Sequence, residues 1–252
     1  MSKLERGSTE WWADYLTHGH RLEGLARILF PRLPSGPRCK ICLVPFSGFG
    51  KVLGPFGWSP SRKNPSMCGF CSERLPAGGA EVPVAVLVAD VCGYTSLSEN
   101  ENDKVVAQKM NAFFERASSI LMTHDALIDK FLGDAVQALF LPGACGPEFV
   151  IRAVRAAEAI ATAYSAGEIK VRVAVVSGIA FVGNVGAQGM VDLTAMGDVV
   201  NTCHRLQGVA GVGSVIVTEE TWREAGRPEG WVAQSIAVKG KAEPVATRQR
   251  SF

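Results

Sequence analysis

Asp90 stands where a buried strand is predicted to leave the core. The five apolar residues from Val84 to Val88 are too few for a helix and do not alternate with polar residues, so they predict a strand buried on both faces. The following turn, Gly93, Tyr94 and Thr95, can expose backbone amide donors. A carboxylate beside such a turn suits a divalent metal bound to phosphates, although a solvated Asp in a loop gives the same local pattern.

A second carboxylate, Asp134, lies in a predicted hairpin turn. The run 124–140 contains two strand-like segments that meet at Gly133 and Asp134, a dipeptide typical of tight hairpins. Further along the chain, Asn201 and Arg205 are four residues apart, and they therefore lie on one face of a predicted helix.

Four cysteines form two Cys-x-x-Cys pairs, Cys39 with Cys42 and Cys68 with Cys71, separated by 25 residues. The surrounding segment 31–79 is rich in Pro, Gly and Ser and could hardly fold by hydrophobic burial alone. Four thiolates match a tetrahedral metal site, whose binding energy would fold the segment. A structural Zn²⁺ is the first candidate, an iron–sulfur cluster the second, and redox or incidental thiols the remaining interpretation.

The composition is that of an ordinary globular protein of 252 residues with a net charge of +2. Residues 1–80 carry 11 Lys and Arg against 5 Asp and Glu, but no basic run is interleaved with aromatic residues, so we expect no nucleic-acid binding. No apolar run approaches the roughly 18 residues that span a bilayer, and no signal-peptide core is present. These features predict a soluble, cytoplasmic protein, and the odd total of seven cysteines argues against a disulfide framework.

The front of the chain has an amphipathic pattern from Thr9 to Phe30, which predicts one or two helices. Their apolar stripe could pack on the same chain or on a second subunit. The stretch 76–80 predicts a linker.

The remaining patterns predict an antiparallel-rich sheet covered by helices on one face. A capping-box pattern at Ser98 to Glu101 is expected to open the first helix of this part, which ends near Met122. The other helices are expected over 147–165, 197–209 and 219–225. The strands are expected over 126–131, 135–141, 169–177, 179–185, 214–217, 231–238 and 244–249, with Gly178 interrupting the middle pair.

Together, the segments around Asp90, Asp134 and Asn201 resemble the catalytic domain of class III nucleotidyl cyclases, the family of adenylyl and guanylyl cyclases. The resemblance extends over about 82–246 and rests on six spaced positions. It implies an α+β fold with a ferredoxin-like core. With the patterns at the front of the chain, we expect a helical segment, a four-cysteine segment with a linker, and a catalytic domain: 1–30, 31–79 and 80–252.

By this resemblance, Asp90 and Asp134 bind two Mg²⁺ or Mn²⁺ ions with help from the Val91 carbonyl, while the turn amides at 93–95 lie near the phosphates. Making cyclic AMP from ATP requires the ribose 3′-hydroxyl to attack the α-phosphorus as pyrophosphate leaves. Two metal ions about 4 Å apart can lower the pKa of that hydroxyl and neutralise the developing charge.

The resemblance also assigns residues to the rest of the nucleotide. Asn201 would orient the ribose, Arg205 would stabilise the pentavalent phosphorus, and Lys239 would contact the terminal phosphates. Lys130 would donate to N1 of adenine, and Thr194 stands where many adenylyl cyclases have Asp and guanylyl cyclases often have Cys. Lys with Thr resembles the class IIIb adenylyl cyclases and favours ATP.

Active sites of this family are composite, so one chain with one catalytic domain implies a homodimer with two equivalent sites. The leading hypothesis is an adenylyl cyclase regulated by its front segment. The alternative is a catalytically silent cyclase-like module that binds nucleotide or acts as a metal- or redox-sensing adaptor. A diguanylate cyclase would carry a Gly-Gly-Asp/Glu-Glu-Phe hairpin, whereas this hairpin reads Leu132-Gly-Asp-Ala.

Overall fold

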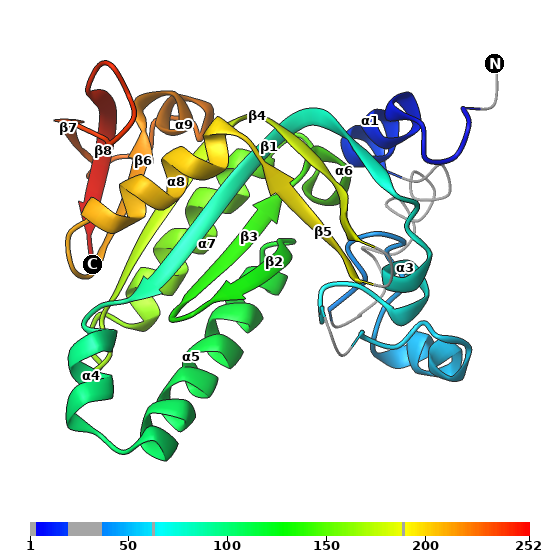
Figure 1. Ribbon diagram of the computed structural model, residues 1–252, viewed down its shortest axis with the longest axis horizontal. Helices are drawn as coiled ribbons and strands as arrows, with labels where there is room; N and C mark the ends of the chain where they lie inside the picture. Colours follow the sequence, from blue (N-terminus) through cyan, green and yellow to red (C-terminus); the bar gives the residue numbers. More distant parts are fainter. Residues whose placement is uncertain (1–3, 20–36, 62–63, 188–189) are drawn as a thin grey trace.

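The computed structural model describes residues 4–19, 37–61, 64–187 and 190–252. Within these ranges the body of the molecule is one sheet with helices on both faces (Figure 1). Its strands are β1 (Gly78–Val91), β2 (Leu127–Leu132), β3 (Ala135–Phe140), β4 (Val171–Ala187), β5 (Met190–Met196), β6 (Ser214–Thr218), β7 (Val232–Ile236) and β8 (Val245–Ser251). They lie in the order β2-β3-β1-β4-β6-β8-β7, with β5 paired to β4 outside this path.

Strand β1 is the centre of the sheet, because it pairs antiparallel with β3 on one side and with β4 on the other. Its residues from Val84 to Val91 are all buried, as the apolar run predicts. Only the β4–β6 pair is parallel among the described strands. The predicted α+β fold with a mainly antiparallel sheet is therefore confirmed.

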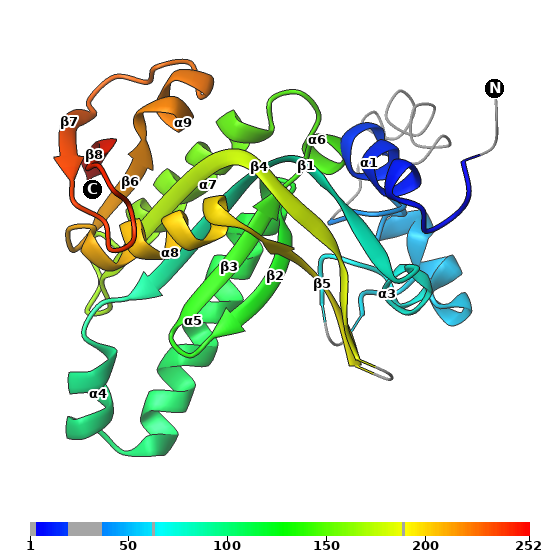
Figure 2. The same ribbon diagram turned by 45° about the horizontal axis from the view of Figure 1, so that its top comes forward.

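The helices cover both faces of the sheet, not one face as the sequence patterns predict. Alternate residues of β1 face two separate hydrophobic clusters, because side chains of a strand point to opposite sides in turn. Ala85, Leu87 and Ala89 pack under α5 (Asp103–Thr123) and α7 (Phe149–Ala163). On the other face, Val84 and Val86 share a cluster with α1 (Thr9–His18) and α8 (Asp198–Val209) (Figure 2).

The shorter helices are α3 (Gly69–Arg74), α4 (Tyr94–Asn100), α6 (Pro142–Cys145), α9 (Glu219–Glu224) and the 3-10 helix η2 (Gly48–Phe56). The predicted capping box is wrong, because Ser98 lies inside α4 and the cap of α5 is Asn102, whose side chain accepts from the Lys104 amide at 2.9 Å. No helix in the described ranges has both the length and the apolar character that a membrane span needs.

Strand β4 is continuous where the sequence predicts a break at Gly178. A Cβ atom at this position would lie 2.8 Å from Cγ2 of Val199, so the glycine makes room for α8 instead of ending a strand. The patterns also miss β5, which carries Thr194 and alternates polar with apolar residues next to the end of β4. Strand β1 begins at Gly78, inside the stretch expected to be a linker.

Helix α1 packs on the sheet of its own chain. Ser8 caps it by accepting from the Trp11 amide, and Trp12 and Leu16 are buried in the cluster that includes β1. Gly143 of α6 lies directly against it, since a Cβ there would be 2.6 Å from the Leu16 carbonyl oxygen. The rest of the predicted front helix, 20–30, lies outside the described residues.

A pair of glycines allows the first residues of β1 to approach β4. Gly79 is paired with Gly183, and a Cβ on Gly183 would lie 2.3 Å from the Gly78 carbonyl oxygen. We expect Gly183→Ala to lower the free energy of unfolding by about 1–3 kcal/mol because the backbones must separate. Chemical denaturation measures this change.

The matched control is Gly208→Ala in α8, where a Cβ meets nothing within 4 Å. This change should leave stability the same or raise it by up to about 1 kcal/mol, since alanine favours helix. Equal unfolding midpoints for Gly183→Ala and the wild type would show that the close approach is not needed.

Candidate functional site

The sheet brings the two predicted metal carboxylates together at one end of its central strands. Asp90, at the end of β1, pairs with Ala135 of β3, and the Val91 amide donates to the Asp134 carbonyl at 3.3 Å. Gly133, with φ of 63°, lets the β2–β3 hairpin turn tightly just before Asp134. The end of β1 and this turn therefore lie side by side.

The electrostatics at this end of β1 favour a bound cation. Burial, and then the charge of Asp90, raise the pKa of Asp134. Arg172 Nε and Gln207 Nε2 donate to Oδ2 of Asp90 at 3.0 and 2.8 Å and hold that carboxylate in place. Two carboxylates and the Val91 carbonyl are hard oxygen donors, and this donor set fits Mg²⁺ or Mn²⁺.

Arg172 and Gln207 are residues that sequence reasoning missed. Arg172 is paired with Asp90 across β1 and β4, and its Nη1 also donates to the Gly208 carbonyl at 3.2 Å. The signal was present, because Arg172 is the one charged residue in the otherwise apolar run 171–176. Gln207 carries no such signal in the sequence.

Asn201 and Arg205 lie on one side of α8, as their spacing predicts, and this side faces outward. Asn201 is exposed, Arg205 is half-buried, and Gln207 on the opposite side of the helix is buried against Asp90. The Arg205 guanidinium lies against the loop that contains Lys239, since a Cβ on Gly240 would be 3.1 Å from Arg205 Nη1. The structure thus brings Arg205 close to the loop of the exposed Lys239.

Lys130 and Thr194 meet at a third residue, Asp129, that the sequence patterns did not single out. Thr194 Oγ1 donates to Asp129 Oδ2 at 2.9 Å, and Lys130 Nζ lies 3.6 Å from Asp129 Oδ1. Burial raises the pKa of Asp129, and the charge of Lys130 opposes that shift. The two predicted base-reading side chains, far apart in sequence, therefore share one buried carboxylate.

The turn after β1 leads directly into α4. Gly93 has φ of 77° and open space around it, and Tyr94, the first residue of α4, packs against the core under α5 and α7. The side chain of Thr95 lies outside the described part of the chain. Amides in the first turn of a helix have no partner within the helix, so this turn offers donors near the two carboxylates.

The four cysteines of the two Cys-x-x-Cys pairs come together as one cluster. Their sulfur atoms all lie within 4.8 Å of one another, and none forms a disulfide. The Cys42 and Cys68 sulfurs are 3.7 Å apart, close to the edge of about 3.8 Å that Zn–S bonds of 2.3 Å give a tetrahedron. The donor set fits a closed tetrahedral metal site.

Backbone amides support these sulfurs as they do bound thiolates. The amides of Cys42 and Cys68 donate to Cys39 Sγ, and the amide of Cys71 donates to Cys68 Sγ. In the metal-free cluster the thiols share their hydrogens: hydrogen bonds from neighbouring thiols, that of Cys42 first, lower the pKa of Cys39, whereas hydrogen bonds with Cys39 raise the pKa of Cys42 and Cys71. Thiolate is the form that a metal binds.

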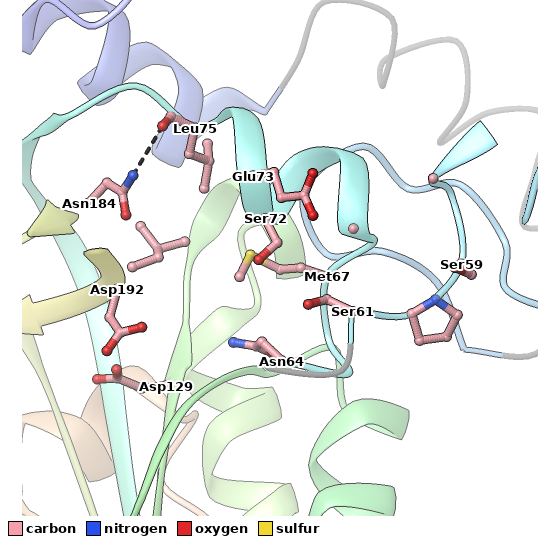
Figure 3. Close-up of a pocket in the computed structure, with 14 residues that line it drawn as sticks. Ser59, Ser61, Asn64, Met67, Ser72, Glu73, Leu75, Asp129, Asn184 and Asp192 are labelled. Carbon is pink, nitrogen blue, oxygen red and sulfur yellow. Dashed lines mark hydrogen bonds between the residues drawn. The ribbon is translucent and has the colours of Figure 1, made fainter. Parts of the chain in front are cut away.

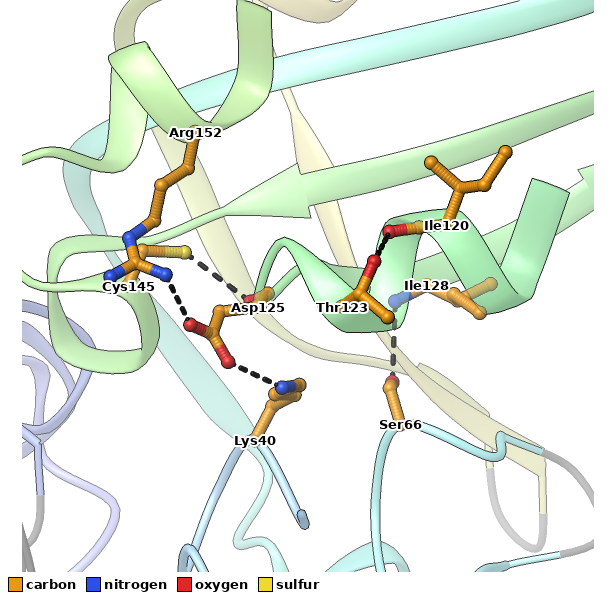
Figure 4. A network of polar contacts seen from close by, with 8 residues as sticks. All are labelled: Lys40, Ser66, Ile120, Thr123, Asp125, Ile128, Cys145 and Arg152. Atoms are coloured by element: carbon orange, nitrogen blue, oxygen red, sulfur yellow. Dashed lines mark hydrogen bonds and ion pairs between the residues drawn. The ribbon is translucent and has the colours of Figure 1, made fainter. Parts of the chain in front are cut away.

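The four-cysteine segment is hydrogen-bonded to β2, the outer strand of the sheet, just before Asp129. Figure 4 shows the contact between Ser66 and Ile128. Asn64 Nδ2 donates to the Ile128 carbonyl at 2.5 Å, and the Ile128 amide donates to Ser66 Oγ at 3.2 Å. Lys40, almost fully buried, forms an ion pair of 2.7 Å with Asp125, which also pairs with Arg152 of α7 at 2.5 Å. The cysteine segment is thus attached on both sides of the start of β2.

Comparisons with known proteins identify the family of this chain. Residues 80–246 match the profile of the adenylate and guanylate cyclase catalytic domain, so the chain belongs to the class III cyclase family. An adenylate cyclase of Anabaena cylindrica is 27% identical over 190 residues, which cover 69% of this chain and 38% of that protein. The chain therefore spans little more than a third of the length of that relative.

Solved structures of both cyclase types share the fold. The adenylyl cyclase CyaB from P. aeruginosa has a TM-score of 0.61 at 26% identity, covering 66% of this chain and 92% of that chain. The guanylyl cyclase Cya2 has a TM-score of 0.62 at 22% identity, covering 68% and 93%. Both cyclase types have this fold, so the fold does not distinguish ATP from GTP as the substrate.

The cysteine geometry predicts about one equivalent of bound metal per chain. We expect zinc, which is colourless, whereas an iron–sulfur cluster would give visible absorbance. Cys68→Ser should lose the metal, and the control Cys92→Ser, outside the cluster, should keep it. Elemental analysis with a visible spectrum, on protein purified without oxygen, measures both. Less than about a tenth of an equivalent of either metal, with all four thiols reduced and free, would rule out the metal centre.

Proposed function

We propose that this chain is an adenylyl cyclase that converts ATP to 3′,5′-cyclic AMP and pyrophosphate at composite sites of a homodimer. The observation that carries the proposal is the meeting of Lys130 and Thr194 at Asp129, in a chain that also retains both metal carboxylates and the Asn201–Arg205 pair. A silent cyclase-like module would be expected to lack one of those catalytic groups.

Two carboxylates close together at the end of β1 are what the reaction needs at the attacking group. Asp90 and Asp134 would hold the two Mg²⁺ or Mn²⁺ ions that class III cyclases use, and bound divalent ions lower the pKa of the 3′-hydroxyl. Arg172 donates to Asp90 through its Nε, and this hydrogen bond would orient the carboxylate for metal binding. The amides at the start of α4 would donate to phosphate oxygens beside this pair.

The other groups act on the ribose and the phosphates. The Asn201 amide would hold a ribose oxygen, and the Arg205 guanidinium would stabilise the charge that spreads over the α-phosphate oxygens. Lys239, exposed on the loop that packs against Arg205, would bind the departing pyrophosphate. Neighbouring Lys241 is already paired with Asp198 at 2.5 Å, so Lys239 is the lysine of this loop that we assign to phosphate.

The orientation of α8 supports a dimer. Asn201 and Arg205 point away from the side of α8 on which Gln207 contacts Asp90. These residues therefore do not face the carboxylates of their own chain. A second copy related by a two-fold axis would supply the facing carboxylates and create two equivalent sites.

Loss of one metal carboxylate should abolish turnover without unfolding the chain. We expect Asp134→Asn to lower kcat for cyclic AMP formation by at least about a thousandfold, because the site loses a metal ligand. The control is Asp103→Asn, an exposed residue in the first turn of α5. Product is measured by chromatography with ATP and either metal ion; folded Asp134→Asn protein with wild-type turnover contradicts the assignment.

Composite sites make a separate prediction about mixtures. Asp134→Asn and Arg205→Ala proteins, each inactive alone, should regain part of the activity when mixed, because the heterodimer contains one site with neither change. Subunit exchange is followed independently with two affinity tags. A mixture that exchanges subunits and stays inactive would contradict the shared site.

We also infer that the four-cysteine segment regulates nucleotide binding through β2. Ser66 and Asn64 hold Ile128, two residues before Lys130, so loss of the segment's structure would release the hairpin that reads the base. This contact supports the regulatory role that we assign to the front of the chain.

Removal of these hydrogen bonds should weaken ATP binding more than turnover. We expect Ser66→Ala with Asn64→Ala to raise the KM for ATP by about fivefold to tenfold, with bound metal retained, because each lost hydrogen bond costs about 1 kcal/mol. Ser72→Ala in α3, with no hydrogen bond to β2, is the control. An unchanged KM in the double variant would separate the segment from base recognition.

A further inference from the structure

Asp129 is the buried carboxylate at which Lys130 and Thr194 meet, and the catalytic steps proposed for this chain do not use its own side chain. Its side chain has no exposed surface, although it borders the pocket between the four-cysteine segment and β5 (Figure 3). It lies at an irregularity of β2, where the pairing with β3 shifts between Ile128 and Lys130. A buried charge lowers the stability of the fold unless it is hydrogen-bonded and paired with an opposite charge.

The partners of Asp129 are donors. Thr194 Oγ1 donates to Oδ2 at 2.9 Å, and the Gln137 side-chain amide donates to the same oxygen. Gln137 Oε1 in turn lies 2.5 Å from His204 Nε2, so the NH₂ group of Gln137 faces the carboxylate and its oxygen faces the imidazole. The whole arrangement directs hydrogen atoms toward Asp129.

This arrangement fixes the hydroxyl of Thr194. A threonine hydroxyl has one hydrogen, and the other acceptor that it reaches among the described residues, the Ala195 carbonyl, is 3.5 Å away. The Asp129 oxygen is closer, and the Lys130 ammonium and the donors Thr194 and Gln137 favour its ionised form, so it takes that hydrogen. Thr194 then has only lone pairs left to offer to a bound base.

Lys130 lies near the other oxygen of the same carboxylate and offers the base a hydrogen-bond donor, where Thr194 offers an acceptor. Its Nζ lies 3.6 Å from Asp129 Oδ1, which has no hydrogen-bond partner in the described residues, and the ammonium can only donate. An acceptor beside a donor is complementary to adenine, which presents a 6-amino donor and an N1 acceptor. Guanine presents a 6-oxo acceptor and an N1–H donor, so both contacts would be mismatched.

We propose that Asp129 determines purine specificity as a positioning residue: by accepting the only hydroxyl hydrogen of Thr194, it makes Thr194 an obligate acceptor for the 6-amino group of adenine. The inference rests on the proposed adenylyl cyclase function and identifies what makes a threonine, which could otherwise donate or accept, selective. Asp129 itself acts on the base only through its neighbours.

The test measures kcat/KM for ATP and for GTP in the full-length chain. We expect Asp129→Ala to lower the ATP-to-GTP ratio of kcat/KM by at least about fivefold, because the freed hydroxyl can turn and donate to a 6-oxo group. Asp129→Leu, which has nearly the shape of Asp without an acceptor, should do the same and serves if the alanine variant does not fold.

Asp129→Asn is the matched control. It keeps an oxygen that can accept from Thr194 and Gln137, so its purine ratio should stay within about twofold of the wild type. Its overall kcat/KM should fall for both nucleotides, since the negative charge facing Lys130 is lost. If Asp129 had only a structural role, its variants would not change the ATP-to-GTP ratio of kcat/KM independently of kcat/KM itself.

A double-mutant cycle with Thr194→Val tests whether Asp129 affects purine specificity through the Thr194 hydroxyl. Thr194→Val alone should lower the ratio, and adding Asp129→Ala should lower it no further, because the effect runs through the missing hydroxyl. A wild-type ratio in folded Asp129→Ala and Asp129→Leu, or fully additive effects in the cycle, would overturn the proposal. A wild-type chain that makes no cyclic AMP from ATP would instead contradict the proposed function and this inference with it.

Discussion

Two hydrogen bonds on the backbone of Ile128 connect the four-cysteine segment to the sheet of the cyclase domain. Strand β2 is the outer strand of the sheet beyond β3, and an outer strand leaves backbone groups that need partners. Ser66 and Asn64 provide them from the four-cysteine segment. Ile41 and Met67 of that segment are buried in the cluster that includes β1, and its four thiols lie close enough to hold one metal ion. We infer that metal binding completes the fold of the segment and that the position of β2 depends on it.

The consequence extends from β2 into the nucleotide site. Asp129 and Lys130 directly follow Ile128, and Asp129 connects to Thr194 on β5 and, through Gln137, to His204 on α8. His204 is the neighbour of Arg205 in the sequence. Hydrogen bonds, together with the chain connection from Ile128 to Asp129, thus link the cysteine segment, the base-reading residues and the helix that carries the proposed catalytic pair.

Much of this arrangement could be predicted from the sequence, for reasons that are local. The apolar run at Val84 predicts β1, the Gly133–Asp134 dipeptide predicts the hairpin, and the Cys-x-x-Cys pairs predict the cluster. Strand β5 and the roles of Asp129 and Gln207 were missed, because they depend on contacts between distant segments that no periodicity records. Gly178 was misread as a break, since sequence alone does not show that Val199 packs against it.

The dependence of β2 on the metal segment can be measured directly by amide hydrogen exchange. The Ile128 amide donates to Ser66 Oγ, whereas the Val86 amide lies deep in the sheet and serves as the internal reference. Removal of the metal by a chelator under native conditions should speed exchange at Ile128 by at least about tenfold and leave Val86 unchanged. Equal protection of Ile128 in metal-loaded and fully metal-free protein would contradict the account.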